Sequence, residues 1–204
     1  MKKQVIVIHG GTTFATYKQY LAYLKKEELN FEKTISKRWK DHLGEKLGKG
    51  FEVVMPLMPN SANARYLEWK IWFEKLFPFL EKEVVLLGHS LGGLFLAKYL
   101  SEQKFPQKIL GTILVAPPYD GEGSEESLDY FKLKKDLSGL QKQSGRLIFY
   151  HSQDDENVPM VDFVKYKKAL PGACFREFKN RGHFGQKNFP EIVREIKNLF
   201  KSAK

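Results

Sequence analysis

The segment from Val84 to Gly93, VVLLGHSLGG, restricts the fold more than any other part of the sequence. Four apolar residues precede a glycine, a histidine, a serine and two more glycines, which is typical of a buried strand that turns sharply into a helix. The five residues centred on Ser90, GHSLG, match the pattern G-x-S-x-G, in which glycines let a strand and a helix pack closely around a strained corner that exposes the serine hydroxyl. A tight turn with no chemical role is the simpler alternative.

The rest of the chain alternates between strands and helices in the same way. Short apolar runs, several rich in β-branched residues, predict six buried strands: Gln4–Ile8, Phe51–Met55, Glu83–Leu87, Gly111–Val115, Arg146–Tyr150 and Cys174–Phe178. Helical periodicity predicts helices near Tyr17–Leu29, Ile35–Leu47, Ala64–Leu80, Leu91–Glu102, Pro159–Leu170 and Phe189–Phe200. This alternation predicts a single α/β domain over residues 1–204, with a mainly parallel sheet of about six strands and helices on both faces.

The helix predicted over Ala64–Leu80 is amphipathic. Trp69 and Leu76 lie on its apolar face, and either Trp72 or Phe73 completes that face. The sequence leaves open which of these two neighbours lies on the buried side.

Between the fourth and fifth predicted strands lie about 30 residues, 116–145, that begin Pro-rich, Gly-rich and acidic and then become helical. Connections of this length within a compact domain are usually functional or mobile. A short lid over the carboxyl edge of the sheet and a plain surface insertion are both compatible with the sequence.

A serine hydroxyl is a weak nucleophile, so a catalytic serine needs a base and an orienting acid. Of the five histidines, His183 is the candidate base, because it lies between two glycines after the last predicted strand, at the edge where α/β sites form. Asp154 and Asp155 follow the strand that ends at Tyr150, and either carboxylate can accept the histidine Nδ1–H and fix its tautomer. The other is expected to cap the turn or the helix that begins at Pro159.

Negative charge that develops on a substrate oxygen needs backbone N–H donors. The N–H of Leu91, directly after the serine, is one candidate, and the segment HGGTT after the first strand offers another at Gly11, with Thr12 as the alternative. These glycines fit neither G-x-G-x-x-G nor G-x-x-x-x-G-K-[ST], so a nucleotide-binding loop is disfavoured. No organic cofactor or metal is expected, because His, Cys and Asp residues do not cluster at ligand spacing beyond the candidate triad.

Charge and cysteine content bear on partners and compartment. The chain has 34 basic and 24 acidic residues and a net charge of +10, which can attract nucleic acid, anionic membranes or acidic small molecules. Acidic residues are interleaved with the lysines, as over Lys25–Lys49, and no nucleic-acid-binding motif accompanies them. The single cysteine, Cys174, cannot form an intramolecular disulfide, and no apolar run approaches the ~20 residues of a membrane span. We therefore expect a cytoplasmic protein with no nucleic-acid partner and no membrane insertion.

Taken in order, these motifs resemble the α/β-hydrolase superfamily. The segments VIVIHGG, MPNSANARYLEW, LLGHSLGG, SQDDENVP and RGHFGQ span almost the whole chain. The serine corner is common to the superfamily, whereas MPN…AR…W and GHF are similar to a branch of small, nearly lidless serine hydrolases that includes the retinoblastoma-binding serine hydrolase and its bacterial relatives. The resemblance implies Ser90 as nucleophile, His183 as base and Asp155 as acid, since Asp155 stands where the pattern D-x-x-[VL]-P has its aspartate. Relatives often have a proline before the first glycines, where this chain has His9.

The motifs and the resemblance together predict an enzyme. The expected reaction is hydrolysis of small carboxylic esters through an acyl-Ser90 intermediate, with short acyl chains favoured because a short lid offers little wall for a long one. A thioesterase or a peptidase of the same fold is one alternative, and a non-catalytic interaction module on a hydrolase scaffold is another. An intact set of Ser90, Asp155 and His183 argues against the scaffold.

Overall fold

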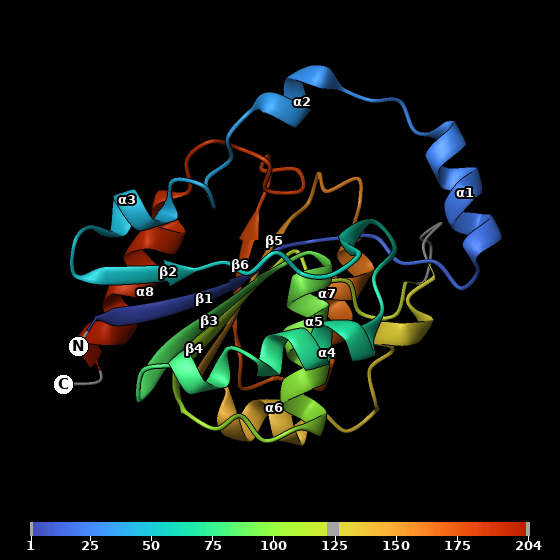
Figure 1. Ribbon diagram of the computed structural model, residues 1–204. Coiled ribbons are helices and arrows are strands. Elements are labelled where there is room, and N and C mark those ends of the chain that lie inside the picture. Colours follow the sequence, from blue (N-terminus) through green and yellow to red (C-terminus); the bar gives the residue numbers. More distant parts are fainter. Residues whose placement is uncertain (1, 122–126, 203–204) are drawn as a thin grey trace.

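Six parallel strands form one sheet, in the order β2-β1-β3-β4-β5-β6. The computed structural model describes residues 2–121 and 127–202, whose arrangement is seen in Figure 1. The strands are β1 Lys3–Ile8, β2 Phe51–Val54, β3 Glu83–His89, β4 Lys108–Val115, β5 Arg146–Ser152 and β6 Cys174–Phe178. Because all of them run in the same direction, their carboxyl ends meet at one edge of the sheet, where loops can bring distant residues together.

Alternate residues of the central strands belong to two separate cores, one on each face of the sheet. In β1, Ile6 and Ile8 belong to the first core, whereas Val5 and Val7 belong to the second. Since side chains alternate along a strand, a strand that is apolar at every position requires helices on both sides of the sheet. The predicted α/β architecture, with its six-stranded parallel sheet, is confirmed.

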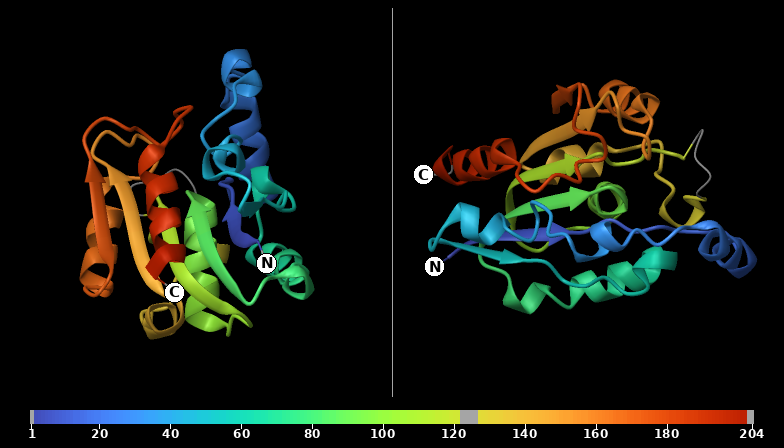
Figure 2. Two further views of the ribbon diagram at one scale, coloured as in Figure 1. Left: turned by 90° about the vertical axis from the view of Figure 1, so that its left-hand side faces the viewer. Right: turned by 90° about the horizontal axis from the view of Figure 1, so that it is seen from above.

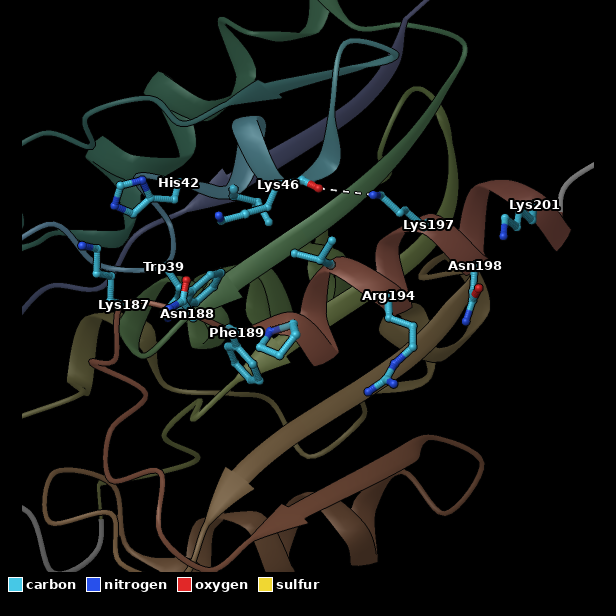
Figure 3. Close-up of a pocket in the computed structure, with 13 residues that line it drawn as sticks. Trp39, His42, Lys46, Lys187, Asn188, Phe189, Arg194, Lys197, Asn198 and Lys201 are labelled. Atoms are coloured by element: carbon cyan, nitrogen blue, oxygen red, sulfur yellow. Dashed lines mark hydrogen bonds between the residues drawn. The ribbon is translucent and has the colours of Figure 1, made fainter.

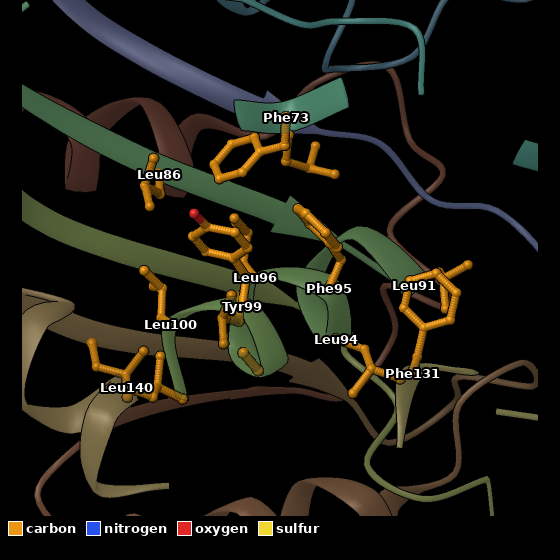
Figure 4. Close-up of a cluster of buried hydrophobic side chains, with 14 of the residues drawn as sticks. Phe73, Leu86, Leu91, Leu94, Phe95, Leu96, Tyr99, Leu100, Phe131 and Leu140 are labelled. Atoms are coloured by element: carbon orange, nitrogen blue, oxygen red, sulfur yellow. The ribbon is translucent and has the colours of Figure 1, made fainter. Parts of the chain in front are cut away.

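Helices cover both faces, as Figure 2 shows from two further directions. The first core is closed by α4 (Tyr66–Glu74), α5 (Leu91–Glu102), α6 (Ser138–Gln143) and α7 (Met160–Ala169). The second core is closed by α3 (Leu43–Leu47) and α8 (Pro190–Ser202). Figure 4 shows part of the first core, where Phe95 and Tyr99 of α5 lie below Phe73 of α4.

Two helices stand apart from these layers. Figure 1 shows α1 (Tyr17–Lys26) and α2 (Phe31–Ile35) at a distance from the sheet. No residue of α1 is buried. The ring of Phe14 connects α1 to the body, with centroid distances of 5.7 Å to Tyr20 and 5.1 Å to Tyr23.

The prediction of one continuous helix over Ile35–Leu47 is wrong. The chain forms α2, which ends at Ile35, and then α3, which begins at Leu43. Between them Trp39 is 3% exposed, its backbone N–H donates to Gln186 O (3.0 Å), and its indole N–H donates to Phe184 O (2.8 Å). A residue whose backbone N–H bonds a distant loop does not make the intrahelical bond that a continuous helix requires.

The helix predicted over Ala64–Leu80 is shorter than expected. It ends at Glu74, and Phe77–Phe79 forms a separate 3₁₀ helix, η2. Pro78 accounts for the break, because proline removes one helical hydrogen bond and clashes with the preceding turn. The structure also distinguishes the two neighbours on α4: Phe73 is 1% exposed and Trp72 is 45% exposed.

The segment 116–145 divides into parts with different surroundings. Residues 122–126 of this expected lid lie outside the described residues. Phe131 belongs to the first core, and α6 packs against α5 at the end remote from Ser90. That the other residues of this segment form a short lid over the carboxyl edge of the sheet stays a prediction. In the described ranges, no helix combines the length and apolar character that crossing a membrane requires.

Phe73 provides a direct test of this core. Phe73→Ala should lower the free energy of unfolding by about 3–5 kcal/mol, because it leaves a cavity among the rings of Phe95, Tyr99 and Phe105. Trp72→Ala, one position away and exposed, should cost less than about 1 kcal/mol. Urea unfolding of the two variants measures the difference, and equal losses would contradict the assignment of Phe73 to the core.

Candidate active site

Ser90 occupies a strained corner between β3 and α5. Its backbone has φ 56° and ψ −128°, a conformation that non-glycine residues rarely adopt and that costs on the order of 1–3 kcal/mol. The Ser90 N–H donates to Val115 O (2.8 Å), and Ser90 O accepts from the N–H groups of Gly93 (2.8 Å) and Leu94 (3.2 Å). The corner is therefore held by β4 on one side and by the first turn of α5 on the other.

Glycines permit the close packing of this corner. A Cβ on Gly88 would lie 2.5 Å from Gly92 O, and a Cβ on Gly92 would overlap the backbone oxygens of Ile8 and His9. Backbone atoms cannot move aside as the end of a side chain can. The first turn of α5 consequently reaches the end of β1 only because these two positions lack side chains.

His183 and Asp155 meet at the same edge of the sheet. The Nδ1 atom of His183 lies 3.0 Å from Asp155 Oδ1 and 2.9 Å from Oδ2. The Asp155 side chain is fully buried, and its Oδ1 also accepts from the backbone N–H groups of Asn157 (2.9 Å) and Val158 (3.0 Å). Because the Nδ1–H points to the carboxylate, the unprotonated nitrogen of a neutral His183 is Nε2.

His89 connects the loops of Ser90 and His183. No hydrogen bond joins Ser90 Oγ to His183 among the described contacts, but the His89 and His183 rings lie 4.9 Å apart and His89 Nε2–H donates to His183 O (2.9 Å). The Lys40 ammonium donates to His89 Nδ1 (3.0 Å). Burial and then the charge of Lys40 lower the pKa of His89 well below its ordinary value, and burial lowers the pKa of Lys40 to about 8. A neutral His89 thus holds the backbone of His183.

Both residues predicted to supply backbone N–H donors line a small cavity beside Ser90. Gly11 and Leu91 line it, and its volume of about 30 Å³ leaves room for about two water molecules. A Cβ on Gly11 would overlap Ser61 O, so no larger residue fits there. Thr12 N–H donates to Ser61 O (2.9 Å) and is therefore already engaged. The geometry favours Gly11 over Thr12 as the second donor.

His9 supports the first loop, which follows β1. Met58 N–H donates to His9 Nε2 (2.9 Å), which leaves the Nδ1–H to donate to Gly10 O (2.7 Å). Burial lowers the pKa of His9. The imidazole in this tautomer ties the Gly10–Gly11 turn to the segment after β2.

Asp154 has a different environment from Asp155. Its Oδ1 accepts from the Ser152 hydroxyl and from Gly182 N–H (2.9 Å), and Ser152 Oγ in turn accepts from Arg181 N–H (2.9 Å). The Ser152 hydroxyl is the main cause that lowers the pKa of Asp154. Asp154 therefore secures the turn that precedes His183 and does not contact the imidazole.

His151 supports the loop that carries Asp155. Its Nε2–H donates to Val158 O (3.1 Å), and its ring stacks on Phe163 with centroids 5.2 Å apart. Burial lowers the pKa of His151 as well. Three neutral histidines thus hold three different loops at one edge of the sheet: His89 and His151, which are buried, and His9, which is partly buried.

Comparisons with known proteins identify the family and the fold of this chain. A family model described as serine hydrolase matches residues 31–199, which is most of the chain. This chain belongs to the serine hydrolase family. It is similar to the serine hydrolase RBBP9 of Rattus norvegicus, with 24% identity over 160 residues that cover 76% of this chain and 81% of that protein. The small serine hydrolase branch suggested by the sequence is confirmed.

Solved structures share the fold of this serine hydrolase. The ydeN gene product of B. subtilis superimposes with a TM-score of 0.73 at 19% identity, over 98% of this chain and 100% of that one. The esterase domain of a Rhodothermus marinus protein superimposes with a TM-score of 0.58 at 15% identity, over 98% of this chain and 84% of that one. At such low identity the likeness concerns the fold, and the predicted α/β-hydrolase fold is confirmed.

Sequence reasoning missed the supporting residues of this serine hydrolase. Lys40 was not singled out, because its contact with His89 spans 49 residues. His9, His89 and His151 were seen at strand ends, yet no role followed for them. Their position at the carboxyl ends of strands was the available signal, since side chains there meet at the site edge. In the described part of the chain, no three His, Cys, Asp or Glu side chains are grouped as a metal site.

The Asn variants of Asp155 and Asp154 are expected to differ in activity. Asp155→Asn should lower kcat by about 10²–10⁴-fold, because an amide favours the wrong tautomer of His183 and removes its stabilising charge. Asp154→Asn, the matched control, should retain most of the activity and lose some thermal stability, because only the turn before His183 is loosened. Both variants should be assayed on p-nitrophenyl acetate. A crippled Asp154→Asn with an active Asp155→Asn would reverse the assignment.

Three neutral histidines that are buried or partly buried predict that the protein loses stability in mild acid. The folded-state pKa values of His9, His89 and His151 lie below the unfolded value, so the unfolded chain binds protons first as the pH falls. Their contribution is complete above about pH 6.5 and declines below it, by at most about 1.4 kcal/mol per histidine and pH unit. The unfolding free energy should fall by on the order of 2–4 kcal/mol between about pH 7.5 and 5.5.

Urea unfolding at several pH values measures this slope. His89→Gln should reduce it, because glutamine can still bond Lys40 and His183 O but does not titrate. A free energy that is constant between pH 7.5 and 5.5 would show that the unfolding of the protein is not linked to these histidines.

Proposed function

We propose that this protein hydrolyses small carboxylic esters through an acyl-Ser90 intermediate, with His183 as base and Asp155 as the acid that orients it. The observation that carries the proposal is the pair of contacts of 2.9 and 3.0 Å from His183 Nδ1 to the buried Asp155 carboxylate, at the same sheet edge as the strained Ser90. A carboxylate in this position fixes the tautomer whose Nε2 can accept the serine proton.

The reaction follows from the positions of these groups. Ser90 Oγ attacks the carbonyl carbon of the ester while His183 Nε2 accepts the hydroxyl proton. The N–H groups of Leu91 and Gly11 bind the oxyanion of the tetrahedral intermediate. His183 then donates its proton to the leaving alcohol, and the acyl-Ser90 ester is hydrolysed by a water that His183 activates. The hydrogen bond from the Ser90 hydroxyl to His183 Nε2 is expected to form when substrate is present, because catalytic hydrogen bonds are often long or misaligned in unliganded enzymes.

The cavity supports esters with short acyl chains. Its volume is about 30 Å³, and its walls include Pro118, Leu128 and Val158. These apolar side chains suit a small acyl group, and Asn157 and Asp162 add polar groups to the same lining. The fold shared with the esterase domain of the Rhodothermus marinus protein supports the same reaction class. Pro118 and Leu128 belong to the segment proposed as a short lid.

Location and partners are part of the same proposal. We expect a cytoplasmic enzyme whose partner is a small acyl substrate, since the single cysteine, Cys174, leaves no intramolecular disulfide to form. Thioesters and amides would use the same residues, so a panel of acetyl esters, thioesters and anilides separates an esterase from a thioesterase or peptidase.

Ser90→Ala tests covalent catalysis. This variant should fold normally and lose on the order of 10⁴-fold or more in kcat, because only binding and oxyanion stabilisation remain. A fluorophosphonate probe should label the native protein on the peptide that contains Ser90 and leave Ser90→Ala unlabelled. Ser138→Ala on α6 is the control and should behave as the native protein. A native protein that the probe does not label would favour the non-catalytic scaffold.

A further inference from the structure

A second hollow lies away from Ser90, between α3, the segment 187–190 and α8 (Figure 3). This α3–α8 pocket has a volume of about 510 Å³, against about 30 Å³ for the cavity beside Ser90. A volume of several hundred Å³ is typical of sites for small molecules. The proposed ester hydrolysis makes no use of it.

The α3–α8 pocket is strongly cationic. Five basic side chains line it: Lys46, Lys187, Arg194, Lys197 and Lys201. None of the 13 lining residues is an aspartate or a glutamate. The carboxylate of Glu45 lies 3.7 Å from Lys46 Nζ but is 70% exposed, so water weakens this pair. Like charges gathered in a hollow attract anions and repel one another until an anion arrives.

One of these cations links the two helices that border the pocket. Lys197 Nζ of α8 donates to the backbone oxygen of Lys46 at the end of α3 (3.2 Å), as the dashed line in Figure 3 marks. The bond joins α8 to the end of α3 through the Lys46 backbone oxygen. An anion in the pocket would therefore meet positive charge from α3 and from α8 at once.

The floor of the α3–α8 pocket is apolar. The rings of Trp39 and Phe189 meet edge to face, with centroids 5.3 Å apart, and each is 3% exposed. Above this floor, Val193 is half-buried and Pro190 is exposed. A ligand that fills the hollow would thus contact apolar surface as well as charge.

We propose that the α3–α8 pocket binds a small organic polyanion, a molecule that joins two or more negative charges, such as a chain of phosphate groups, to a flat apolar group. The lysines and Arg194 would hold the charged groups by charge-assisted hydrogen bonds. The apolar group would lie against Val193 and Pro190. A single negative charge would leave most of the five cations uncompensated.

The shape of the pocket favours a small molecule over nucleic acid. A nucleic-acid strand needs a positive track that follows its backbone over several nucleotides, with aromatic rings exposed for stacking. The cations here line a hollow that follows α8, and both aromatic rings are buried beneath it. Because buried rings cannot stack on bases, the observations favour a small molecule.

The pocket is also in contact with the His183 loop. Trp39, which forms its floor, donates from its indole N–H to Phe184 O (2.8 Å) and from its backbone N–H to Gln186 O (3.0 Å). Phe184 directly follows His183 and has a positive φ of 52°. A ligand that displaces Trp39 would shift the loop that carries His183, the base of the proposed reaction. Binding in the pocket does not itself depend on that reaction.

Calorimetric titration of the full chain tests the proposal. The probes are ATP, which combines phosphates with a flat ring, tripolyphosphate, which lacks the ring, and adenosine, which lacks the charge. At about 100 mM salt, ATP should bind one site with a Kd on the order of 10–100 μM. Tripolyphosphate should bind at least about threefold more weakly, and adenosine should not bind measurably.

Paired variants distinguish the pocket from general surface charge. Lys46→Gln with Lys197→Gln should weaken ATP binding by about tenfold or more. The control, Lys104→Gln with Lys142→Gln, removes the same charge from exposed positions elsewhere and should leave the Kd within about twofold. Circular dichroism of both double variants checks that each remains folded.

Several results would overturn the proposal. ATP that fails to saturate by about 5 mM means that no such site exists. If both double variants bind ATP equally weakly, the binding is due to the net charge of the protein and not to this pocket. If tripolyphosphate binds as tightly as ATP, the pocket makes no apolar contact with the ligand. Affinity for an oligonucleotide that increases with its length would instead identify a nucleic-acid surface. All these readouts are independent of esterase activity.

Discussion

The close approach of α5 to the end of β1 is the constraint on which the rest of the site depends. Gly88 and Gly92 allow it, because a side chain on either would meet backbone atoms. The contact brings Ser90 against the first loop: a Cβ built on Gly10 would lie 3.0 Å from Ser90 Cβ. As a consequence, Leu91 and Gly11, which come from different elements, line one cavity. The strain at Ser90 persists because β4 and α5 hold it from both sides.

Histidines other than His183 organise the loops around this corner. His9 bonds the turn after β1, His89 bonds the backbone of His183, and His151 bonds the loop of Asp155. Each donates one ring N–H to a carbonyl oxygen and is neutral through burial, so each acts as a fixed dipole rather than as a charge. The precision of the Asp155–His183 contact therefore depends on side chains that take no part in the proposed chemistry.

Much of this architecture was predictable from the sequence, for reasons that differ between elements. The strands were found because they are apolar on both faces, and the corner at Ser90 was found because glycines and a serine at fixed spacing have few other uses. The helices around Trp39 and Pro78 were misjudged, since a tertiary hydrogen bond in one case and a proline ring in the other override helical periodicity. The preference for Asp155 over Asp154 came from a family pattern and not from the local sequence. The contact of Lys40 with His89 could not be predicted, because nothing in the local sequence indicates a partner 49 residues away.

Because α1 lies apart from both cores, it can unfold locally. With no buried residue, this ten-residue helix draws little free energy from the cores, and helices of that length are marginal in water. Its order depends on the capping box of Thr16 with Gln19 and on the ring of Phe14. The helix can therefore melt as a separate unit while the sheet stays folded, so that its amides exchange with solvent far faster than those of α5. Insertions and substitutions on the exposed face of α1 would leave both cores of the described chain unchanged.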